Sequence, residues 1–331
     1  MKTVTLLKGD GIGPEIITSV LTVFKYLNIP IAFDEQLLGR EALDKTGEVL
    51  PQATFDSIRT NKVALKAPYE TTKAIGFRSV NVSLRQIFDL YVNIRPLKTL
   101  VKSPLGYKDI DLVILRENTE DLYIGQEEII SEDQEVHAIK KTTRSACERI
   151  IDYAFNYALS NHKNKVTAVH KANILKESDG LFLRIFNERL AHYPQITVND
   201  LIVDNAAMQL VLDPQQFEVI VTSNLYGDIL SDLAAGLIGG LGLAPSANIG
   251  SEGAIFEACH GCAPDIAGKD LANPTALILS SCLLLEYLNF TEEADKIKSA
   301  LKSTLDNNYL TKDLGGTLGT KEFTARLISY L

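Results

Sequence analysis

Residues 217–238, FEVIVTSNLYGDILSDLAAGLI, join a predicted strand to a predicted helix and set the pattern of the whole chain. The apolar run 217–223 is short and rich in β-branched residues, which is typical of a buried strand. Residues 227–238 carry small and apolar side chains at helical spacing. The same strand-then-helix order recurs along the sequence, and this alternation predicts an α/β fold with a largely parallel sheet.

The remaining elements follow from the same patterns of hydrophobicity. Further strands are predicted at 3–7, 62–66, a segment ending near 96, 111–116, 166–171 and 200–204. Further helices are predicted at 14–27, 52–59, 79–88, 143–160, 176–190, 205–212, 273–288 and 292–304.

The composition limits the class of protein. The chain has 331 residues, 46% of them hydrophobic, which is enough for a large core and for roughly two domains. The net charge is −9 without a long run of Lys or Arg, so neither nucleic acid nor a membrane is an expected partner. No apolar stretch has the length of a membrane span, and the N-terminus does not resemble a signal peptide. Four cysteines in such a chain predict reduced thiols and a cytoplasmic location.

Asp228 and Asp232 lie four residues apart in the predicted helix, so their carboxylates share one face. Like charges at this spacing destabilise a helix slightly, and a bound Mg²⁺ or Mn²⁺ would relieve that repulsion because both ions take oxygen ligands. Asp204, at the end of another predicted strand, could supply a third carboxylate. Asp228 could instead cap the helix near its predicted start, whereas Asp232 lies too deep for a cap.

Several predicted strands end in charged or polar residues, where open α/β sheets bind their ligands. Arg85, Arg95 and Arg116 predict a substrate with several carboxylates, because a guanidinium group matches a carboxylate with two parallel hydrogen bonds. Lys171 and Tyr123 could transfer protons beside a metal-bound polyacid. From the residues alone, a dehydrogenase, a lyase and a metal-dependent decarboxylase all remain possible.

The segment GDGIGPE at 9–15 follows a strand and opens a helix, as the glycine-rich loop of a dinucleotide-binding fold does. We interpret it as a tight turn instead. Asp10 adds a negative charge, and Pro14 follows the third glycine, so the segment suits a pyrophosphate poorly.

Ordered motifs cover the chain nearly from end to end. They are GDGIGPEI (9–16), FDLYVNIRP (88–96), LRENTEDLY (115–123), AVHKANI (168–174), VDNAAMQLV (203–211), NLYGDILSDLAAGLIGGLGLAP (224–245), IFEACHGCAPDIAGKDLANP (255–274) and DLGGTLGTKEF (313–323). Together they resemble the β-decarboxylating dehydrogenases of 2-hydroxy acids, namely the isocitrate, isopropylmalate and homoisocitrate dehydrogenases.

The resemblance implies an isopropylmalate dehydrogenase-like, non-Rossmann fold of two domains with a cleft between them. We expect residues 1–97 with 238–331 to form the large cofactor-binding domain. Residues 98–237 would form the small domain with the dimer interface and the metal and substrate residues.

The resemblance also implies a role for individual residues. Tyr123 and Lys171 match the acid–base pair, and Asp204, Asp228 and Asp232 match the Mg²⁺ or Mn²⁺ ligands, with Lys171 and Asp204 supplied by the partner subunit of a homodimer. The implied substrate residues are Ser79, Asn81, Arg85, Arg95, Arg116 and Asn173. The implied cofactor residues are Thr71, Glu257, His260, Gly261, Asp265, Ile266 and Asn273.

Two short segments favour one cofactor and one substrate. Asp265 and Ile266 stand where NADP-dependent relatives have a Lys–Tyr pair, and an aspartate accepts hydrogen bonds from ribose hydroxyls but repels a 2′-phosphate, which favours NAD. Ser79 and Asn81 are similar to the pair that hydrogen-bonds the γ-carboxylate of isocitrate. Against the isopropyl group of isopropylmalate, the same pair would be left without partners, at a cost in binding.

We therefore predict an NAD-dependent isocitrate dehydrogenase that acts on this tricarboxylate. Homoisocitrate dehydrogenase is the alternative, because one methylene discriminates weakly, and isopropylmalate dehydrogenase is less favoured. A non-catalytic regulatory subunit is a third possibility, but such subunits usually lose metal or acid–base residues that this chain retains.

Segment 67–76 lacks the Pro and Gly run common in isocitrate enzymes. We expect neutralisation of Asp228 or Asp232 to reduce turnover while costing the fold little.

Overall fold

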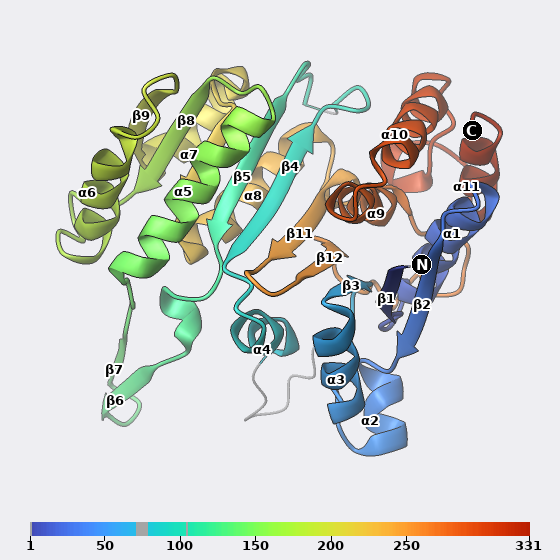
Figure 1. Ribbon diagram of the computed structural model, residues 1–331, viewed down its shortest axis with the longest axis horizontal. Coiled ribbons are helices and arrows are strands. Elements are labelled where there is room, and N and C mark those ends of the chain that lie inside the picture. The colour runs from blue at the N-terminus through green and yellow to red at the C-terminus, as the bar shows by residue number, and fades with distance from the viewer. Residues whose placement is uncertain (1, 71–78, 104) are drawn as a thin grey trace.

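A ten-stranded sheet runs through the molecule (Figure 1). The computed structural model describes residues 2–70, 79–103 and 105–331. In their order across the sheet, the strands are β2 (Ile31–Gln36), β1 (Lys2–Leu7), β3 (Val63–Lys66), β12 (Ala254–Ala258), β11 (Pro245–Ile249), β4 (Val92–Lys98), β5 (Asp111–Glu117), β10 (Val219–Thr222), β8 (Lys165–His170) and β9 (Thr197–Ile202). The strands β2-β1-β3-β12 pair in parallel, and so do β5-β10-β8-β9. The pairings β12–β11, β11–β4 and β4–β5 between these two blocks are antiparallel. The predicted α/β class with a largely parallel sheet is confirmed.

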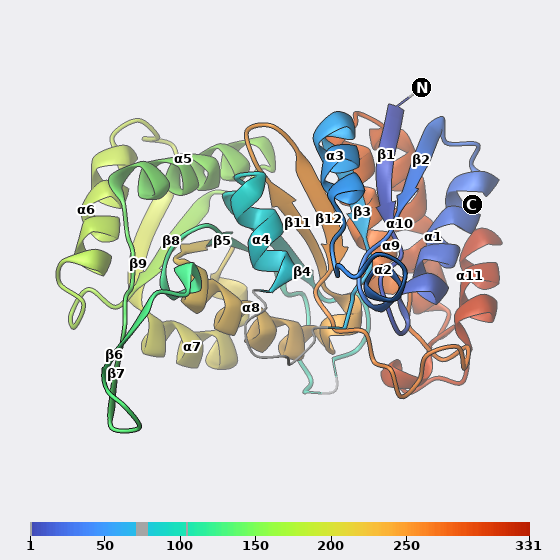
Figure 2. The same ribbon diagram turned by 90° about the horizontal axis from the view of Figure 1, so that it is seen from below.

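Helices cover both faces of this sheet, and Figure 2 shows α5 and α8 on opposite sides of it. The helices are α1 (Gly13–Tyr26), α2 (Arg40–Thr46), α3 (Gln52–Asn61), α4 (Val80–Ile87), α5 (Arg144–Ser160), α6 (Ser178–Leu190), α7 (Val203–Leu212), α8 (Asn224–Ile238), α9 (Thr275–Tyr287), α10 (Thr291–Asp306) and α11 (Thr320–Ile328). A two-stranded hairpin of β6 (Glu127–Ser131) and β7 (Glu135–Ala138) projects from the body of the molecule (Figure 1). Among the described residues, no helix combines the length and the apolar character that a membrane crossing requires.

The strands sort along the sheet by their place in the sequence. Strands β5, β10, β8 and β9 come from residues 98–237 and form one end of the sheet. The other strands come from the two terminal portions of the chain, with β4 at the junction. The division into two domains itself stays a prediction.

Several elements differ from the prediction. Strands β2, β11 and β12, the hairpin β6–β7 and the helices α2 and α11 had not been predicted. The strand predicted at 200–204 is β9, which ends at Ile202, so Asp204 lies in the first turn of α7. Arg95 lies in the middle of β4, not at a strand end.

Helix α8 begins earlier than predicted, and this changes the place of Asp228. Ser223 is its N-cap residue and Asn224 its first residue, so Asp228 lies in the second turn. The prediction that Asp228 could cap the helix is therefore wrong. The helix ends at Gly239, which has a left-handed backbone (φ +117°), and the Gly240 amide donates to the Ala235 carbonyl at 2.8 Å.

Gly227 lets α8 approach β5 closely. A Cβ atom at this position would lie 2.6 Å from both Cβ and Cγ of Arg116, which is too close for any side chain. The Arg116 side chain therefore crosses the helix where there is no Cβ, and its guanidinium group reaches the next residue, Asp228. This packing positions Arg116 and Asp228, two residues of the candidate site.

The glycine-rich segment 9–15 is a tight turn, as the sequence suggested. Gly11 has a positive φ of +60°, and a Cβ there would lie 1.9 Å from the Cys262 carbonyl oxygen. The Asp10 carboxylate accepts hydrogen bonds from the backbone amides of Arg40 at 2.9 Å and Glu70 at 2.8 Å. Asp10 thus ties neighbouring loops together, and these contacts support a structural role for the segment.

Candidate active site

A cavity of about 340 Å³ lies where β3, α4, β4, β5, β12 and α8 meet. Its charged lining residues are Lys66, Arg85, Arg95, Arg116, Asp228 and Glu257. Four cations thus face two carboxylates. A site with this surplus of positive charge favours an anion that carries several charges.

Arg116 and Tyr123 both contact Asp228. Arg116 is 1% exposed, its Nη1 forms an ion pair with the Asp228 carboxylate, and its Nε donates to Asn224 Oδ1 at 2.9 Å. The Tyr123 hydroxyl donates to Asp228 Oδ2 at 2.5 Å. The Tyr123 ring centroid also lies 4.9 Å from Arg116 Cζ. The structure therefore brings together one predicted metal ligand, one predicted substrate residue and one predicted acid–base residue.

These contacts shift the pKa values of the groups involved. Burial, followed by the hydrogen bond to Asp228, raises the pKa of Tyr123, so its hydroxyl keeps its proton at neutral pH. Burial and the nearby Arg85 and Arg95 lower the pKa of Arg116 to about 10, against the pull of Asp228. The repulsion among the three arginines would fall if an anion entered the cavity.

Arg95 lies between the two aspartates of α8. Its Nη1 is 3.1 Å from Asp232 Oδ1 and its Nη2 is 3.4 Å from Asp228 Oδ1. Nη1 also donates to Ser231 Oγ at 2.5 Å. In a single chain, this guanidinium group offsets the like charges at i and i+4.

Buried polar atoms in the cavity wall lack partners. Arg85 Nε, Arg116 Nη2 and Asn81 Oδ1 are each buried without a hydrogen bond to any residue that the structure describes. Unpaired buried polar groups cost free energy, and a ligand that satisfies them recovers it. The guanidinium N–H groups call for acceptor oxygens, as carboxylates supply.

Glu257 and Lys66 form a buried ion pair in the same wall. Lys66 Nζ lies 2.6 Å from Glu257 Oε2, and Arg85 Nη2 lies 4.0 Å from Oε1, which also accepts from Asn248 Nδ2 at 2.8 Å. Burial alone would raise the pKa of Glu257, but Lys66 and Arg85 lower it to about 2. Glu257 was predicted to contact the cofactor, and it lines this cavity. Lys66 was not predicted as a site residue, although its position at the end of the apolar run VALK was a signal.

Ser79, Asn81 and Tyr69 make one end of the cavity polar. The Tyr69 hydroxyl lies 3.5 Å from Ser79 Oγ and accepts from the Asn81 amide at 3.4 Å. Ser79 occupies the N-cap position of α4, and its side chain makes no capping hydrogen bond to the described residues. A helix N-terminus beside polar side chains suits a further negative group of a ligand.

Lys171, Asp204 and Asn173 are not among the residues that line this cavity within the described parts of the chain. Lys171 Nζ and Asp204 Oδ1 lie 2.5 Å apart, the Asp204 side chain is 70% exposed, and Asn173 is exposed. Residues 2–70, 79–103 and 105–331 contain no cluster of three His, Cys, Asp or Glu residues able to hold a metal. One chain thus offers Asp228 and Asp232 as hard oxygen donors, which fit a divalent cation.

The predicted cofactor residues His260 and Gly261 lie at the rim of the same cavity. His260 Nε2 is buried without a hydrogen-bond partner among the described residues, and burial lowers the pKa of its imidazole. A neutral ring with one unpaired nitrogen fits a polar, uncharged part of a ligand. Thr71 and most of segment 67–76 lie outside the described residues.

The other predicted cofactor residues lie further along the same loop. Asn273 Nδ2 donates to Asp313 Oδ2 at 3.0 Å, and its Oδ1 accepts from the Thr275 amide at 3.0 Å, so its side-chain amide is held in place. Asp265 is exposed, whereas Ile266 packs against the hydrophobic core. Of these two residues, Asp265 is therefore the one whose side chain is available to a ligand.

Comparison with known proteins identifies the family. The model of the isocitrate/isopropylmalate dehydrogenase family matches residues 3–327. The chain belongs to this family. The resemblance predicted from the motifs is therefore confirmed, and the protein is a member of a family of oxidoreductases that act on small molecules.

Relatives in this dehydrogenase family carry more than one activity in their names. The NAD isocitrate dehydrogenase catalytic subunit 5 of Arabidopsis thaliana mitochondria is 47% identical over 99% of this chain and 88% of its own. The 3-isopropylmalate dehydrogenase of Methanothermobacter thermautotrophicus is also 47% identical, over 99% of this chain and 98% of its own. The crystal structure of isocitrate dehydrogenase from Methylococcus capsulatus superposes with a TM-score of 0.96 at 46% identity, covering 100% and 99% of the two chains. Overall similarity therefore does not identify the substrate of this protein. The evidence for the substrate has to come from the residues that line the cavity.

The two aspartates of this dehydrogenase should respond differently to neutralisation. Asp228→Asn should lower the free energy of unfolding by about 2 kcal/mol, because the buried cations of Arg116 and Arg95 lose their counter-charge. Asp232→Asn should change it by less than about 0.5 kcal/mol, since that side chain is 57% exposed. Denaturant unfolding of both variants measures this difference, and Mn²⁺-dependent turnover should fall in both. Equal stability of the two variants would contradict the assignment of Asp228 to a buried ion network.

The low pKa of Glu257 predicts how stability depends on pH. A carboxyl group with a lowered pKa in the folded state contributes stability above its ordinary value of 4.5, and this stability is lost as the pH falls toward 2. Wild type should thus exceed Glu257→Gln by about 3 kcal/mol at pH 7, and the gap should narrow between about pH 4.5 and 2. Urea unfolding across this range gives the values. Glu252→Gln, whose side chain is 79% exposed, is the control and should follow the wild type. A gap independent of pH would show that packing, not charge, makes Glu257 stabilising.

Proposed function

We propose that this protein is an NAD-dependent isocitrate dehydrogenase, which oxidises and decarboxylates isocitrate to 2-oxoglutarate and CO₂. The observation that carries this proposal is the cavity wall of four cations, with guanidinium N–H groups on Arg85 and Arg116 that have no partner among the described residues, and a polar end at Ser79 and Asn81. A tricarboxylate would satisfy these groups. An isopropyl group at the polar end offers no acceptor to the Ser79 hydroxyl or to the side-chain N–H groups of Asn81, whereas a carboxylate does, so its binding there would cost free energy.

The residues of the chain would divide the chemistry among them. The arginines bind and orient the carboxylates, and Asp228 and Asp232, with Asp204 of a second subunit, would hold Mg²⁺ or Mn²⁺. A metal ion there would act as a Lewis acid that stabilises negative charge on the substrate oxygen, and bound NAD would be the oxidant that accepts hydride from C2. Loss of CO₂ would then leave an electron pair at C3. Tyr123, which keeps its proton at neutral pH, donates it to that carbon.

Lys171 would assist removal of the hydroxyl proton in the active site of the partner subunit. In its own chain it contacts Asp204, which is outside the cavity. In the proposed dimer, Lys171 and Asp204 of one subunit would therefore act together in the active site of the other subunit.

NAD is the proposed cofactor because Asp265 is exposed on the loop that follows His260. An aspartate there can accept hydrogen bonds from ribose hydroxyls and repels the 2′-phosphate of NADP. Several relatives carry NAD in their names, including the Arabidopsis subunit. His260 and Gly261, at the rim of the cavity, would lie near the same cofactor.

A second copy of this chain is the proposed partner. Large apolar side chains are exposed on α7, on α8 and on the hairpin β6–β7. They include Met208, Val211, Leu212, Ile229, Ile129 and Val136. A monomer rarely leaves so many large apolar residues exposed on a few elements, and an isologous dimer would cover them on both copies. A cytoplasmic location and the two-domain division remain predictions.

The alternatives are disfavoured by the same residues. A non-catalytic regulatory subunit would not need the contacts of Tyr123 and Arg116 with Asp228, which are intact. Homoisocitrate carries the same carboxylates as isocitrate, so the cations of the site bind either substrate. The two substrates differ by one methylene, and only this difference in length can distinguish them.

Steady-state kinetics with NAD and Mg²⁺ test the proposed substrate. The ratio kcat/KM should be highest for isocitrate among isocitrate, homoisocitrate and isopropylmalate. Asn81→Leu should lower it for isocitrate by about 100-fold and shift the preference toward isopropylmalate, because the polar end of the cavity becomes apolar. A preference for homoisocitrate above about tenfold would replace isocitrate as the substrate.

Mixing of two inactive variants tests whether the active sites are shared. Homodimers of Tyr123→Phe and of Lys171→Met should each lose turnover. In a mixed dimer, the Lys171→Met chain keeps Tyr123 and receives Lys171 from its partner, so one of the two sites is complete. Random mixing should restore about a quarter of the wild-type activity, because half of the dimers are mixed. If the mixture stays inactive, each chain builds its site alone.

A further inference from the structure

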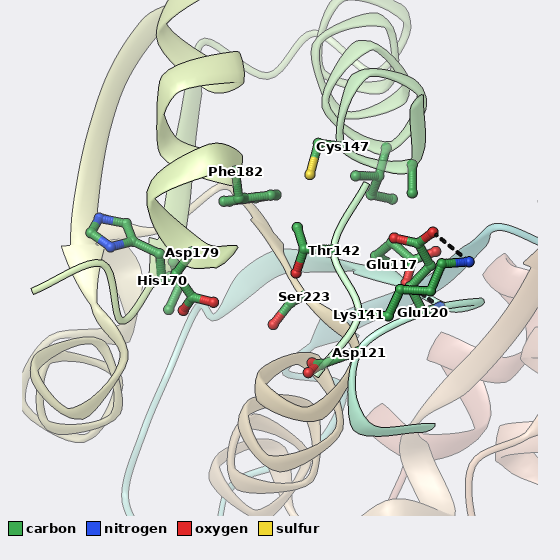
Figure 3. A pocket seen from close by; sticks show the side chains of 13 residues that line it. Glu117, Glu120, Asp121, Lys141, Thr142, Cys147, His170, Asp179, Phe182 and Ser223 are labelled. Atoms are coloured by element: carbon green, nitrogen blue, oxygen red, sulfur yellow. Dashed lines mark hydrogen bonds and ion pairs between the residues drawn. The ribbon is translucent and has the colours of Figure 1, made fainter. Parts of the chain in front are cut away.

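Lys140 lies between two buried carboxylates outside the cavity described above. Its Nζ is 2.5 Å from Asp179 Oδ1 and 3.6 Å from Asp121 Oδ1, and its side chain is 14% exposed. The ring of Tyr226, on α8, lies with its centroid 4.5 Å from the same nitrogen. Both aspartates line a small cavity of about 20 Å³. Figure 3 shows that they reach it from different segments of the chain.

Asp121 holds the segment that carries Tyr123. Its Oδ1 accepts from the Leu122 amide at 2.9 Å and so caps the short turn Leu122–Ile124. Its Oδ2 accepts from the Leu225 amide at 2.9 Å, in the first turn of α8. Asp121 is 3% exposed and has a positive φ of +69°, a backbone conformation that non-glycine residues adopt only when the surroundings impose it.

Asp179 holds the segment that carries Lys171. It lies in the first turn of α6, and its Oδ2 accepts from the Lys171 backbone amide at 2.6 Å. Like Asp121, it is 3% exposed. Asp179 thus binds the Lys171 amide with one oxygen and Lys140 with the other. Asp121 binds backbone amides with both oxygens, and its Oδ1 also lies near Lys140.

We propose that Lys140 is a positioning residue that sets the placement of Tyr123 and Lys171 relative to each other. Its single ammonium group lies between the two buried carboxylates that anchor these segments and so connects them. The name "Lys140 brace" is used here for Lys140, Asp121 and Asp179.

The Lys140 brace has a consequence that rests on the proposed function. If Tyr123 acts in its own chain's site and Lys171 acts in the partner's, then one lysine positions half of each of two active sites. A change at Lys140 should reach both sites of a dimer even when only one chain carries it. No residue of the brace is among those that line the substrate cavity within the described parts of the chain, so its effect on substrate binding should be small.

Replacement of Lys140 in the homodimer gives the first test. Lys140→Met keeps the length of the side chain and removes its charge, and Lys140→Gln serves as a second variant that keeps a hydrogen-bond donor. We expect kcat for isocitrate to fall about tenfold while KM changes by less than about twofold, because positioning for proton transfer is lost and the arginines are untouched. Lys163→Met is the matched control: Lys163 Nζ pairs with Asp111 at 2.8 Å with its side chain 22% exposed, and kcat should not change.

Mixed dimers, purified with two affinity tags, measure separately how Lys140 affects Tyr123 and how it affects Lys171. A Lys140→Met chain paired with a Tyr123→Phe chain reports the effect on Tyr123. The same chain paired with a Lys171→Met chain reports the effect on the Lys171 that it delivers to its partner. Both should be several-fold slower than the corresponding dimers with Lys140 intact.

Three outcomes would decide against the proposal. It is overturned if Lys140→Met and Lys140→Gln keep the wild-type kcat, if they raise KM as much as they lower kcat, or if only one of the two mixed dimers is slowed. A failure of Tyr123→Phe and Lys171→Met chains to complement each other would instead contradict the shared site of the proposed function. The homodimer kcat would then still decide the role of Lys140.

Discussion

The contact of Arg116 with Asp228 is the interaction on which the rest of the site depends. It forms because α8 has a glycine at 227, where the arginine side chain crosses the helix. Asp228 in turn receives the Tyr123 hydroxyl, and the next turn of α8 brings Asp232 to Arg95. A methyl group at residue 227 would separate strand from helix and displace all of these groups together, so a residue without any functional atom governs the geometry.

The electrostatics of the cavity follow from burying more positive than negative charge. Lys66 pairs with Glu257, and Arg95 and Arg116 pair with the aspartates of α8, but Arg85 Nε and Arg116 Nη2 have no hydrogen-bond partner among the described residues. A core of this kind is unfavourable by itself, because buried cations repel one another and lack water. The folded protein without ligand is therefore less stable because of these cations, and the proposed substrate would supply the negative charge that they lack.

The sequence predicted what is local and missed what depends on contacts between distant segments. The alternation of strands and helices gave the α/β class, and the motifs located Arg85, Arg95, Arg116, Tyr123 and Asp228, which lie together. Strands such as PSANI and AIFEA were missed because they are short and poor in β-branched residues. The start of α8 and the position of Asp204 were misplaced by a few residues, since a strand can pass directly into a helix. The pairing of Lys66 with Glu257 and the contacts of the Lys140 brace could be found only in the folded chain, because nothing in the sequence at these positions identifies their partners.

An anion bound by the surplus of cations in the cavity would also change how long the protein survives in the cell. A multivalent anion that binds the folded state and not the unfolded chain shifts the folding equilibrium by mass action, by about 2.7 kcal/mol at a hundred times its dissociation constant. Degradation in cells draws on the unfolded population, which such a shift reduces about a hundredfold. A pool of polycarboxylates would therefore protect the protein that consumes it, and depletion of the pool would leave the same cations to hasten its turnover.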